Sequence, residues 1–395
     1  MSGTASLTPK PRLLEGIKIV DLTSVVFGPY CTQLLAEMGA DVIKVEPPLG
    51  DIFRRAGVPA ATPAMGPCHM VLNRGKRSVA LDLKSPADAE LMHALIADAN
   101  VFIHNVRAAG IEKLGFGYQA LHEKHPGLIY VHCVGYGSGG PYSGLQAYDD
   151  AIQAASGMTS FFSRVDGDPR PRYVPSTIAD KTAGMHAAYA VLAAIIHKLR
   201  TGEGQHVEVP MFECFTQFLY EEHLFGATFD PPTGPIGYAR QIDPNRQPYP
   251  TRDGYISIVP YTDESLQMTF AVLRASDFLE RPEFATLLGR LANITLLYAE
   301  IARRTPARTT QEWVRLFNEA QVPAMAVRDF SDIMQDPHLQ ATNFFEKHTH
   351  PTEGPYYAMR PPVRFSAAPD LPVRDAPLLG EHTEQLRASL LGDRN

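Results

Sequence analysis

The beginning of the chain alternates between strand-like and helical apolar patterns, and this alternation most limits the folds open to it. Residues 17–22 predict a buried strand, residues 30–38 have the apolar spacing of a helix that ends at Gly39, and residues 41–46 predict a second strand. A strand, a helix and a strand within about thirty residues form a parallel βαβ unit. The linking residues 25–29 contain no Gly-x-Gly-x-x-Gly, so the fingerprint of a dinucleotide site is missing.

The same alternation continues for two hundred residues or so, which is typical of a doubly wound α/β sheet. Further strands are predicted at 78–83, 101–105, 128–134 and 205–209. One helix is predicted to begin at Ser85-Pro86 and another lies near Ile111; the remaining helices are predicted at 149–157, 181–199 and 211–225.

A change of composition then divides the chain. Residues 230–252 are rich in Pro, Gly and Asn and predict a linker or surface excursion. A strand at 254–259, helices within 265–319 and short strands near Pro323 follow, and residues 355–365 and 370–380 are predicted to be extended. We therefore expect a first part of a large domain at 1–229, a small domain with its linker at 230–325, and a return to the large domain at 326–395.

Composition and charge exclude several classes of protein. With 395 residues, 45% of them hydrophobic, the chain is long enough for two domains with cores. A net charge of -7 gives no basic footprint for nucleic acid. The cysteines lie far apart, without Cys-x-x-Cys or Cys/His spacing, which favours reduced thiols in the cytoplasm over a metal site. These cysteines are Cys31, Cys68, Cys133 and Cys214.

Neither a targeting segment nor a membrane span is predicted. Residues 1–12 have no apolar core of a secretory signal. The longest apolar run, 187–196, has about half the length that spans a bilayer. We therefore expect a soluble, cytoplasmic protein with neither a membrane nor nucleic acid as partner.

One acidic residue stands at the start of an apolar helix. From Lys181 to Leu199 the apolar residues recur at helical spacing, which places Asp180 at or beside the helix start. The positive end of the helix dipole favours an ionised carboxylate there at neutral pH. An ionised carboxylate can act as a nucleophile, but an acid in this place can equally be a simple helix cap.

Short motifs along almost the whole chain carry a resemblance to a known family. They are Leu14-Glu15-Gly16-Ile17-Lys18-Ile19-Val20-Asp21-Leu22, Gly28-Pro29-Tyr30-Cys31-Thr32-Gln33, residues 35–47, Asn73-Arg74-Gly75-Lys76-Arg77-Ser78, Leu81-Asp82-Leu83-Lys84, Lys113-Leu114-Gly115-Phe116, Gly135-Tyr136-Gly137, Ala147-Tyr148-Asp149, residues 175–185 and 376–383. In this order and spacing the sequence resembles the family III coenzyme A transferases (CaiB/BaiF family). That family includes formyl-CoA:oxalate and carnitine-linked CoA transferases and their relatives, the α-methylacyl-CoA racemases.

The resemblance implies a fold, a reaction and partners. Members have a Rossmann-like large domain with a parallel sheet, made from both chain ends, and a smaller inserted α+β domain. Two such chains interlock as a homodimer. The aspartate that matches Asp180 is their covalent nucleophile, which forms an enzyme-CoA thioester. The substrates would be an acyl-CoA and a small carboxylic acid, with no tightly bound cofactor and no metal.

Further site residues follow from the matched motifs. Gly135, Tyr136 and Gly137 could border the acyl site, where backbone amides stabilise an oxyanion, or form an ordinary turn after a strand. A second group would contact coenzyme A, although each of its cations could equally be a solvated surface charge. It comprises Arg74, Lys76, Arg77, Asn105 and Lys113.

Two departures from family patterns bear on specificity. Residues 243–248 replace a run of glycines found in relatives that handle formyl and oxalyl groups, and Pro47 replaces an arginine that packs on adenine. Arg170, Arg172 and Arg246 could meet a second carboxylate, so succinyl-CoA with a dicarboxylate acceptor is one hypothesis.

Two other functions compete with transfer. The racemases have Gly-His-Asp where this chain has Ala147-Tyr148-Asp149, and a tyrosine is a poor base at neutral pH. Transfer is therefore preferred to isomerisation. A protein that binds coenzyme A without turnover is the other alternative.

Overall fold

The structure is a computed structural model that describes residues 11–368 and 374–392. The described residues form two compact units. The first takes residues within Met1–Met158, Tyr173–Leu219 and His338–Asn395, and the second takes Thr159–Arg172 and Tyr220–Pro337.

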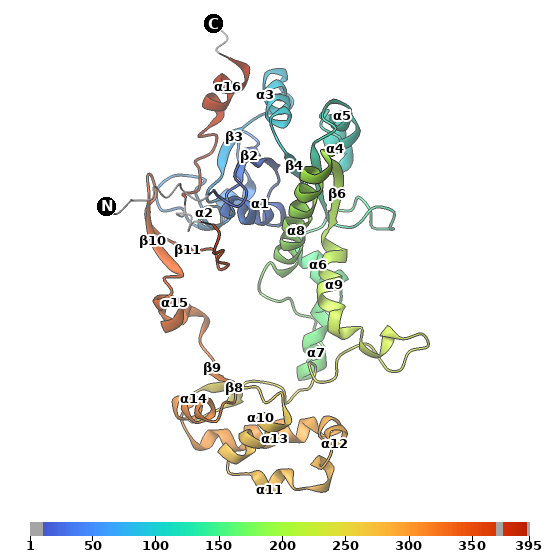
Figure 1. The fold of residues 1–395 in the computed structure, drawn as a ribbon, viewed down its shortest axis with the longest axis vertical. Helices are drawn as coiled ribbons and strands as arrows, with labels where there is room; N and C mark the ends of the chain where they lie inside the picture. The colour runs from blue at the N-terminus through green and yellow to red at the C-terminus, as the bar shows by residue number, and fades with distance from the viewer. Residues whose placement is uncertain (1–10, 369–373, 393–395) are drawn as a thin grey trace, which may run out of the picture. The chain divides into compact units, whose positions relative to one another are not determined.

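A six-stranded parallel sheet organises the first unit (Figure 1). Its strands, in the order β3-β2-β1-β4-β5-β6, are β1 (Lys18–Leu22), β2 (Asp41–Glu46), β3 (Arg77–Ala80), β4 (Val101–His104), β5 (Ile129–Val134) and β6 (Gln205–Pro210). This is the strand order of doubly wound nucleotide-binding folds. The predicted α/β fold with a parallel sheet is therefore confirmed.

Helices cover both faces of this sheet because strand side chains alternate between the faces. On one face α1 (Phe27–Glu37) and α8 (Ile178–Thr201) pack on residues such as Ile19 and Val131. On the other face α3 (Pro86–Ala97) packs on residues such as Val20 and Phe102. Both faces are buried, which explains the nearly continuous apolar runs of β4 and β5.

Most of the other elements that begin in the first unit are short, apart from α9. They are η1 (Ile52–Arg55), α2 (Pro67–Leu72), α4 (Ala108–Lys113), α5 (Tyr118–Lys124), α6 (Asp149–Ala155), η2 (Met158–Ser160), α9 (Met211–His223), β10 (Phe345–His350), β11 (Gly354–Met359) and α16 (Thr383–Leu391). Helices α2, α5 and α16 and strand β10 were not predicted from the sequence. Part of the predicted extended stretch 370–380 lies outside the described residues.

The second unit combines a small antiparallel sheet with helices. Its strands are β7 (Tyr249–Pro250), β8 (Tyr255–Ile258) and β9 (Ala324–Ala326). Its helices are α7 (Phe161–Asp166), η3 (Phe225–Thr228), α10 (Asp263–Val272), α11 (Ser276–Leu279), η4 (Pro282–Phe284), α12 (Leu287–Ala292), α13 (Ile294–Arg304), η5 (Thr305–Ala307), α14 (Thr310–Glu319) and η6 (Phe330–Gln335). Helix α15 (Pro337–Ala341) begins at the last residue of this unit and continues into the first. Its core gathers aromatic residues, among them Phe270, Trp313 and Phe317.

The boundaries of this unit differ from the expected 230–325. It begins at Tyr220, ends at Pro337 and also takes residues 159–172. Ring contacts explain both differences at its start: Phe225 stacks on Tyr238 with centroids 5.4 Å apart, and Phe161 lies 4.5 Å from His223. None of the helices in the described ranges is both long and apolar enough to cross a membrane.

Candidate active site

Asp180 lies in the first turn of α8 and is only 7% exposed. The residue that precedes the helix is Thr177, and the side chain that binds the first amides belongs to Asp149. Asp149 Oδ1 accepts the backbone N–H of Ala179 at 2.7 Å and that of Asp180 at 3.0 Å. The alternative that Asp180 is merely the helix cap is therefore wrong.

Asp149 is itself held firmly. It begins α6, is 6% exposed, and its Oδ2 accepts a hydrogen bond from Gln153 Nε2 at 2.6 Å. The Gln153 amide also bonds to the backbone of Val174 and Ser176, just before α8. One glutamine thus fixes both the capping carboxylate and the chain that enters the helix.

This arrangement changes the charge of Asp180. Burial, together with the negative charge of Asp149, raises the pKa of Asp180 to about 7. The backbone N–H of Phe27 and the charge of Lys181 lower the pKa and limit the rise. The expectation that the helix dipole keeps this carboxylate ionised at neutral pH therefore needs correction, because Asp149 uses the amides of the helix start. A carboxylate of raised pKa is a stronger base once ionised, as functional carboxylates often are.

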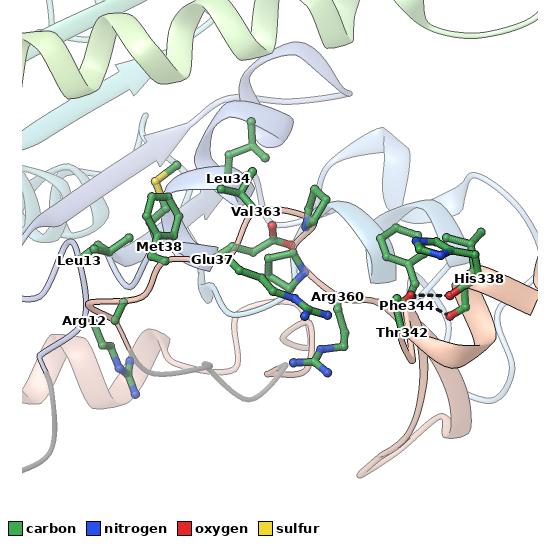
Figure 2. Close-up of a pocket in the computed structure, with 16 residues that line it drawn as sticks. Arg12, Leu13, Leu34, Glu37, Met38, His338, Thr342, Phe344, Arg360 and Val363 are labelled. Atoms are coloured by element: carbon green, nitrogen blue, oxygen red, sulfur yellow. Dashed lines mark hydrogen bonds between the residues drawn. The ribbon is translucent and has the colours of Figure 1, made fainter. Parts of the chain in front are cut away.

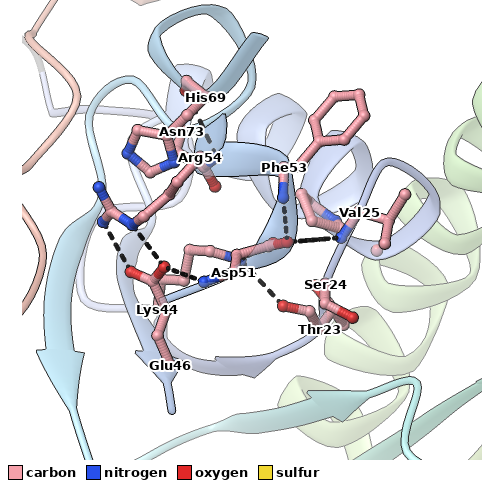
Figure 3. Close-up of polar contacts among 12 residues, drawn as sticks. Thr23, Ser24, Val25, Lys44, Glu46, Asp51, Phe53, Arg54, His69 and Asn73 are labelled. Atoms are coloured by element: carbon pink, nitrogen blue, oxygen red, sulfur yellow. Dashed lines mark hydrogen bonds and ion pairs between the residues drawn. The ribbon is translucent and has the colours of Figure 1, made fainter. Parts of the chain in front are cut away.

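The loop that delivers Phe27 is held in a strained conformation. Val25 has φ 71°, a value that a β-branched residue rarely adopts. The Asp51 carboxylate accepts its N–H at 3.1 and 3.3 Å, as Figure 3 shows. Asn105 binds the neighbouring Ser24 twice, accepting its N–H at 3.1 Å and donating to its carbonyl at 3.0 Å. Backbone strain that the surroundings enforce in this way is common at functional sites.

Helices α1 and α8 approach each other closely at Gly184, one turn after Asp180. A Cβ atom at this position would lie 2.9 Å from the Phe27 carbonyl oxygen and 3.0 Å from a ring carbon of Tyr30. Only glycine permits this approach without a shift of the α1 backbone. Gly184 therefore keeps the start of α1 against the face of α8 that carries Asp180.

Buried ion pairs support the strands below the loop (Figure 3). Arg54 binds Glu46 with two hydrogen bonds of 2.6 and 2.7 Å, and both side chains are almost completely buried. Lys44 binds Asp51 at 3.1 Å and the Thr23 carbonyl at 2.9 Å. Burial alone would raise the pKa of Glu46, but Arg54 and Lys44 lower it to about 2. The pairs thus fix Asp51, which in turn holds Val25.

Three of the cations expected to bind coenzyme A, namely Arg74, Lys76 and Arg77, are engaged within the chain. Lys76 is buried and donates to Asp21 at 3.2 Å, to the Pro29 carbonyl at 3.0 Å and to Asn73 at 2.9 Å. Arg77 pairs with Asp41 at 2.6 and 3.0 Å, at the amino ends of β3 and β2. Ligands of open α/β sheets approach the opposite, carboxyl ends.

Arg74 donates to the Met359 carbonyl at 2.7 Å and to Glu37 at 2.8 Å. Asn105 follows β4 directly and lies at the carboxyl end of the sheet. Lys113 ends α4, is exposed, and has no ion-pair partner among the described residues. The five predicted coenzyme contacts therefore do not form one cluster in this structure.

The predicted glycine loop follows β5 and leads toward Asp149. A Cβ at Gly135 would come within 2.4 Å of Ala147 Cβ, so this loop lies against the segment that enters α6. Tyr136 packs on the rings of Tyr142 and Phe212. The Gly137 N–H is donated to the Glu213 carboxylate at 3.0 and 3.2 Å, so an acyl oxygen would have to compete with Glu213 for it.

The structure also shows the surroundings of the residues that the sequence linked to substrate specificity. Tyr148, where the racemases have histidine, is 62% exposed. Arg172 pairs with Asp166 at 2.6 Å and Arg170 lies 3.5 Å from Asp168, while Arg246 donates to Gln241 at 2.6 Å. Within residues 11–368 and 374–392, no group of three or more His, Cys, Asp and Glu side chains could hold a metal ion.

A separate cavity of about 580 Å³ lies in the first unit (Figure 2). The end of α1 and residues 360–365 line it, with Arg12, Leu34, Met38 and Phe344 around it. Glu37 faces it and is the partner of Arg74. Neither Asp180 nor Asp149 is among its lining residues, so it is distinct from the candidate active site.

Sequence reasoning singled out Asp180 but missed the residues that control it. Asp149 lay in a matched motif, yet nothing in the sequence predicted its contact with a residue 31 positions later. No pattern in the sequence indicated that Asp51 holds the Val25 loop or that Gln153 holds Asp149.

The six-stranded parallel sheet, with helices on both faces, and the buried carboxyl group at the start of α8 define a doubly wound α/β protein with a candidate reactive carboxylate. Residues 14–383 match the model of CoA-transferase family III, and the chain belongs to this family.

Similar proteins agree with this assignment. A succinate–glutarate CoA-transferase of Agrobacterium fabrum is 31% identical over 386 residues, covering 95% of each chain. A succinyl-CoA:mesaconate CoA-transferase of Haloarcula marismortui is 32% identical, covering 94% of this chain and 95% of its own. The crystal structure of a CaiB/BaiF family protein from Brucella suis has a TM-score of 0.80 at 30% identity, covering 97% of this chain and 100% of its own.

Proposed function

We propose that this transferase moves coenzyme A from succinyl-CoA to a small dicarboxylic acid, with Asp180 as the covalent nucleophile. The observation that carries the proposal is the buried Asp180 carboxyl group, with a pKa of about 7, at the start of α8. Such a group is half ionised near neutral pH, and its burial limits access of water to a reactive intermediate.

The proposed reaction has four balanced steps. The Asp180 carboxylate attacks the thioester carbonyl of the donor, the carbon–sulfur bond breaks, and coenzyme A leaves as its thiolate. The thiolate attacks the Asp180 carbonyl of the mixed anhydride, which releases the donor acid and leaves an aspartyl-CoA thioester. The acceptor carboxylate then attacks that thioester and expels the thiolate. Finally the thiolate attacks the acceptor's acyl carbonyl, which forms the new acyl-CoA and frees Asp180.

Backbone amides near Asp180 are the proposed donors to the developing oxyanions. The Phe27 N–H already interacts with the Asp180 carboxylate. The loop at Gly135, Tyr136 and Gly137 is proposed to border the acyl group, because Gly135 lies against the segment that leads to Asp149.

Two of the predicted coenzyme contacts remain open to a ligand: Asn105 lies at the carboxyl end of the sheet, and Lys113 is exposed at the end of α4. We propose that Lys113 meets a phosphate, since it is exposed and unpaired in the described part of the chain. Asn105 would act by holding the Ser24 backbone. Arg74, Lys76 and Arg77 would have to exchange their present partners to bind coenzyme A.

The substrate class rests on the relatives. Two of them are named for succinate or succinyl-CoA and for the dicarboxylates glutarate and mesaconate. The cytoplasmic location and the lack of a tightly bound cofactor remain predictions from the sequence.

We also propose a homodimer, interlocked as the family resemblance implies. Met185, Tyr189, Ile196 and Leu199 are 47 to 75% exposed on α8. Together with the half-buried Leu192 they are spaced by four, three, four and three residues, which is the spacing of a helix–helix seam. A second copy of the chain would cover this stripe.

A transfer assay tests the proposed substrates. Wild-type protein is mixed with succinyl-CoA and single acids, including glutarate, mesaconate, acetate and oxalate, and new acyl-CoA is measured by chromatography. We expect turnover with the dicarboxylates glutarate and mesaconate and little with acetate. Turnover with monocarboxylates alone would contradict the proposed acceptor class without touching the transferase assignment.

A further inference from the structure

The second unit contains an arginine-rich cavity of about 620 Å³, and none of its lining residues belongs to the candidate active site. It lies between the ends of α10 and α13 and the start of α14. Five arginines line it, together with a single acidic residue, Glu312, and the side chain of Trp313. The arginines are Arg252, Arg274, Arg303, Arg304 and Arg308.

The carboxylates around this cavity do not balance its positive charge. Arg303 and Arg304 both bind Glu300 at 2.6 Å, and Arg252 binds Glu312 at 2.9 Å. Arg274 and Arg308 have no carboxylate ion-pair partner in the described part of the chain. Five guanidinium groups therefore face two carboxylates, which leaves an excess of three positive charges.

Helix ends explain part of this excess. Arg303 and Arg304 end α13, where cations interact favourably with the helix dipole. Arg252 and Arg308 come from loops, and their backbones are joined by the hydrogen bond from the Arg252 N–H to the Arg308 carbonyl at 2.9 Å. Arg304 likewise donates to the Arg274 carbonyl at 2.9 Å. These two hydrogen bonds hold the segments that carry the arginines around the cavity. Helix dipoles alone would not bring these segments together.

We propose that this cavity binds the phosphate group of a small molecule. The planar guanidinium group donates paired hydrogen bonds that match phosphate oxygens. A phosphate carries up to two negative charges on one compact group, which suits the two arginines without a partner better than a single carboxylate does. The phosphate could belong to a free phosphate compound or to coenzyme A, and the test below separates these sources.

Trp313 offers a direct reporter because it is the only tryptophan of the chain. Its ring is 3% exposed, its Nε1 donates to the Thr305 carbonyl at 2.6 Å, and the Arg308 guanidinium lies over the ring, 5.5 Å from its centroid. An anion that draws Arg308 toward itself would change this contact and with it the fluorescence of the protein.

The experiment titrates pyrophosphate into the full-length protein and follows tryptophan fluorescence in about 0.15 M salt, which screens unspecific surface binding. We expect a saturable change. Arg274→Gln should weaken binding about tenfold or more, because one charge-assisted contact is lost. Arg308→Gln should do the same, and calorimetry should be used for it because this change alters Trp313 itself. Arg308→Lys should bind between wild type and Arg308→Gln, since the charge remains without the planar fork.

The matched control is Arg315→Gln on the same helix, α14. Arg315 is outside the cavity and pairs with Glu319 at 2.9 Å, so its loss should leave the affinity unchanged. Addition of coenzyme A to the pyrophosphate complex then identifies the source of the phosphate: displacement assigns the site to the coenzyme, and retention assigns it to a free phosphate compound. No saturable signal in fluorescence or calorimetry, or equal weakening by Arg315→Gln, would overturn the proposal.

Discussion

The carboxylate of Asp149 stands at the start of the helix that carries Asp180, and it accepts the Asp180 backbone N–H at 3.0 Å. A helix start attracts an anion, and here Asp149 fills that position. Asp180 is thus buried beside a second negative charge, and its pKa rises to about 7. The pair separates two roles: one carboxylate stabilises the helix, and the other is left for chemistry.

The first prediction concerns the charge of Asp149. Asp149→Asn keeps an oxygen that accepts the two backbone N–H groups but removes the negative charge, so the pKa of Asp180 should fall. The rise of kcat/KM with pH, which reports ionisation of Asp180, should then shift to lower pH. Asp150→Asn changes an exposed neighbour and should leave the profile in place. Identical profiles for both variants would show that Asp149 does not control the charge of Asp180.

The second prediction concerns stability. Between pH 4 and pH 7 folded Asp180 retains a proton that the unfolded chain has lost, so this group makes the protein less stable as the pH rises through that window. A rise from 3.8 to about 7 corresponds to about 4 kcal/mol. Asp180→Asn should therefore raise the melting temperature at pH 8, and the gain should shrink toward pH 4. A melting temperature below that of wild type at pH 8 would contradict the raised pKa.

The third prediction concerns the buried pair of Glu46 and Arg54. Glu46→Gln leaves an unpaired guanidinium group in the interior and should destabilise the first unit by about 3 to 5 kcal/mol. Asp98→Asn breaks the exposed pair with Lys18 and should cost less than about 1 kcal/mol. Chemical unfolding of the two variants measures the difference. Equal decreases in the free energy of unfolding would mean that the pair of Glu46 and Arg54 does not support the segment that carries Asp51.

The fourth prediction concerns the apolar stripe on α8. Tyr189→Arg together with Ile196→Arg places two charges on a surface that a second copy is proposed to cover, and should shift the protein toward monomer or aggregate in sedimentation velocity. Val58→Arg changes a residue of the same unit outside α8 that is 88% exposed, and it should leave the dimer intact. A double variant that sediments as wild type would remove α8 from the dimer interface.

The sheet could be predicted because its strands are buried on both faces and are therefore rich in β-branched and other apolar residues, most clearly in β4 and β5. Residues 41–46 were predicted with their observed bounds. Helix α16 was missed because it is short and mostly polar, and it is held by packing on the other face of the sheet through Leu386. Local patterns carry no information on such tertiary support.

The charges around the site could not be placed from the sequence. Arg77 and Asp41 are adjacent because β3 pairs with β2 in one register, which places two strand starts side by side. Asp149 meets Asp180 because α6 and α8 pack together. The sequence pattern placed Asp180 at the start of a helix. Only the fold shows that Asp149 binds the helix amides and that Asp180 remains free to react.

Chemical trapping of Asp180 tests the central claim most directly. Trypsin cuts after Arg172 and Lys181, and Asp180 is the only acidic residue of the resulting peptide 173–181. Protein mixed with succinyl-CoA and hydroxylamine should yield this peptide with Asp180 converted to the hydroxamate, whereas omission of the acyl-CoA, or the variant Asp180→Asn, should yield none. An unmodified peptide 173–181 from protein that still transfers coenzyme A would contradict the account.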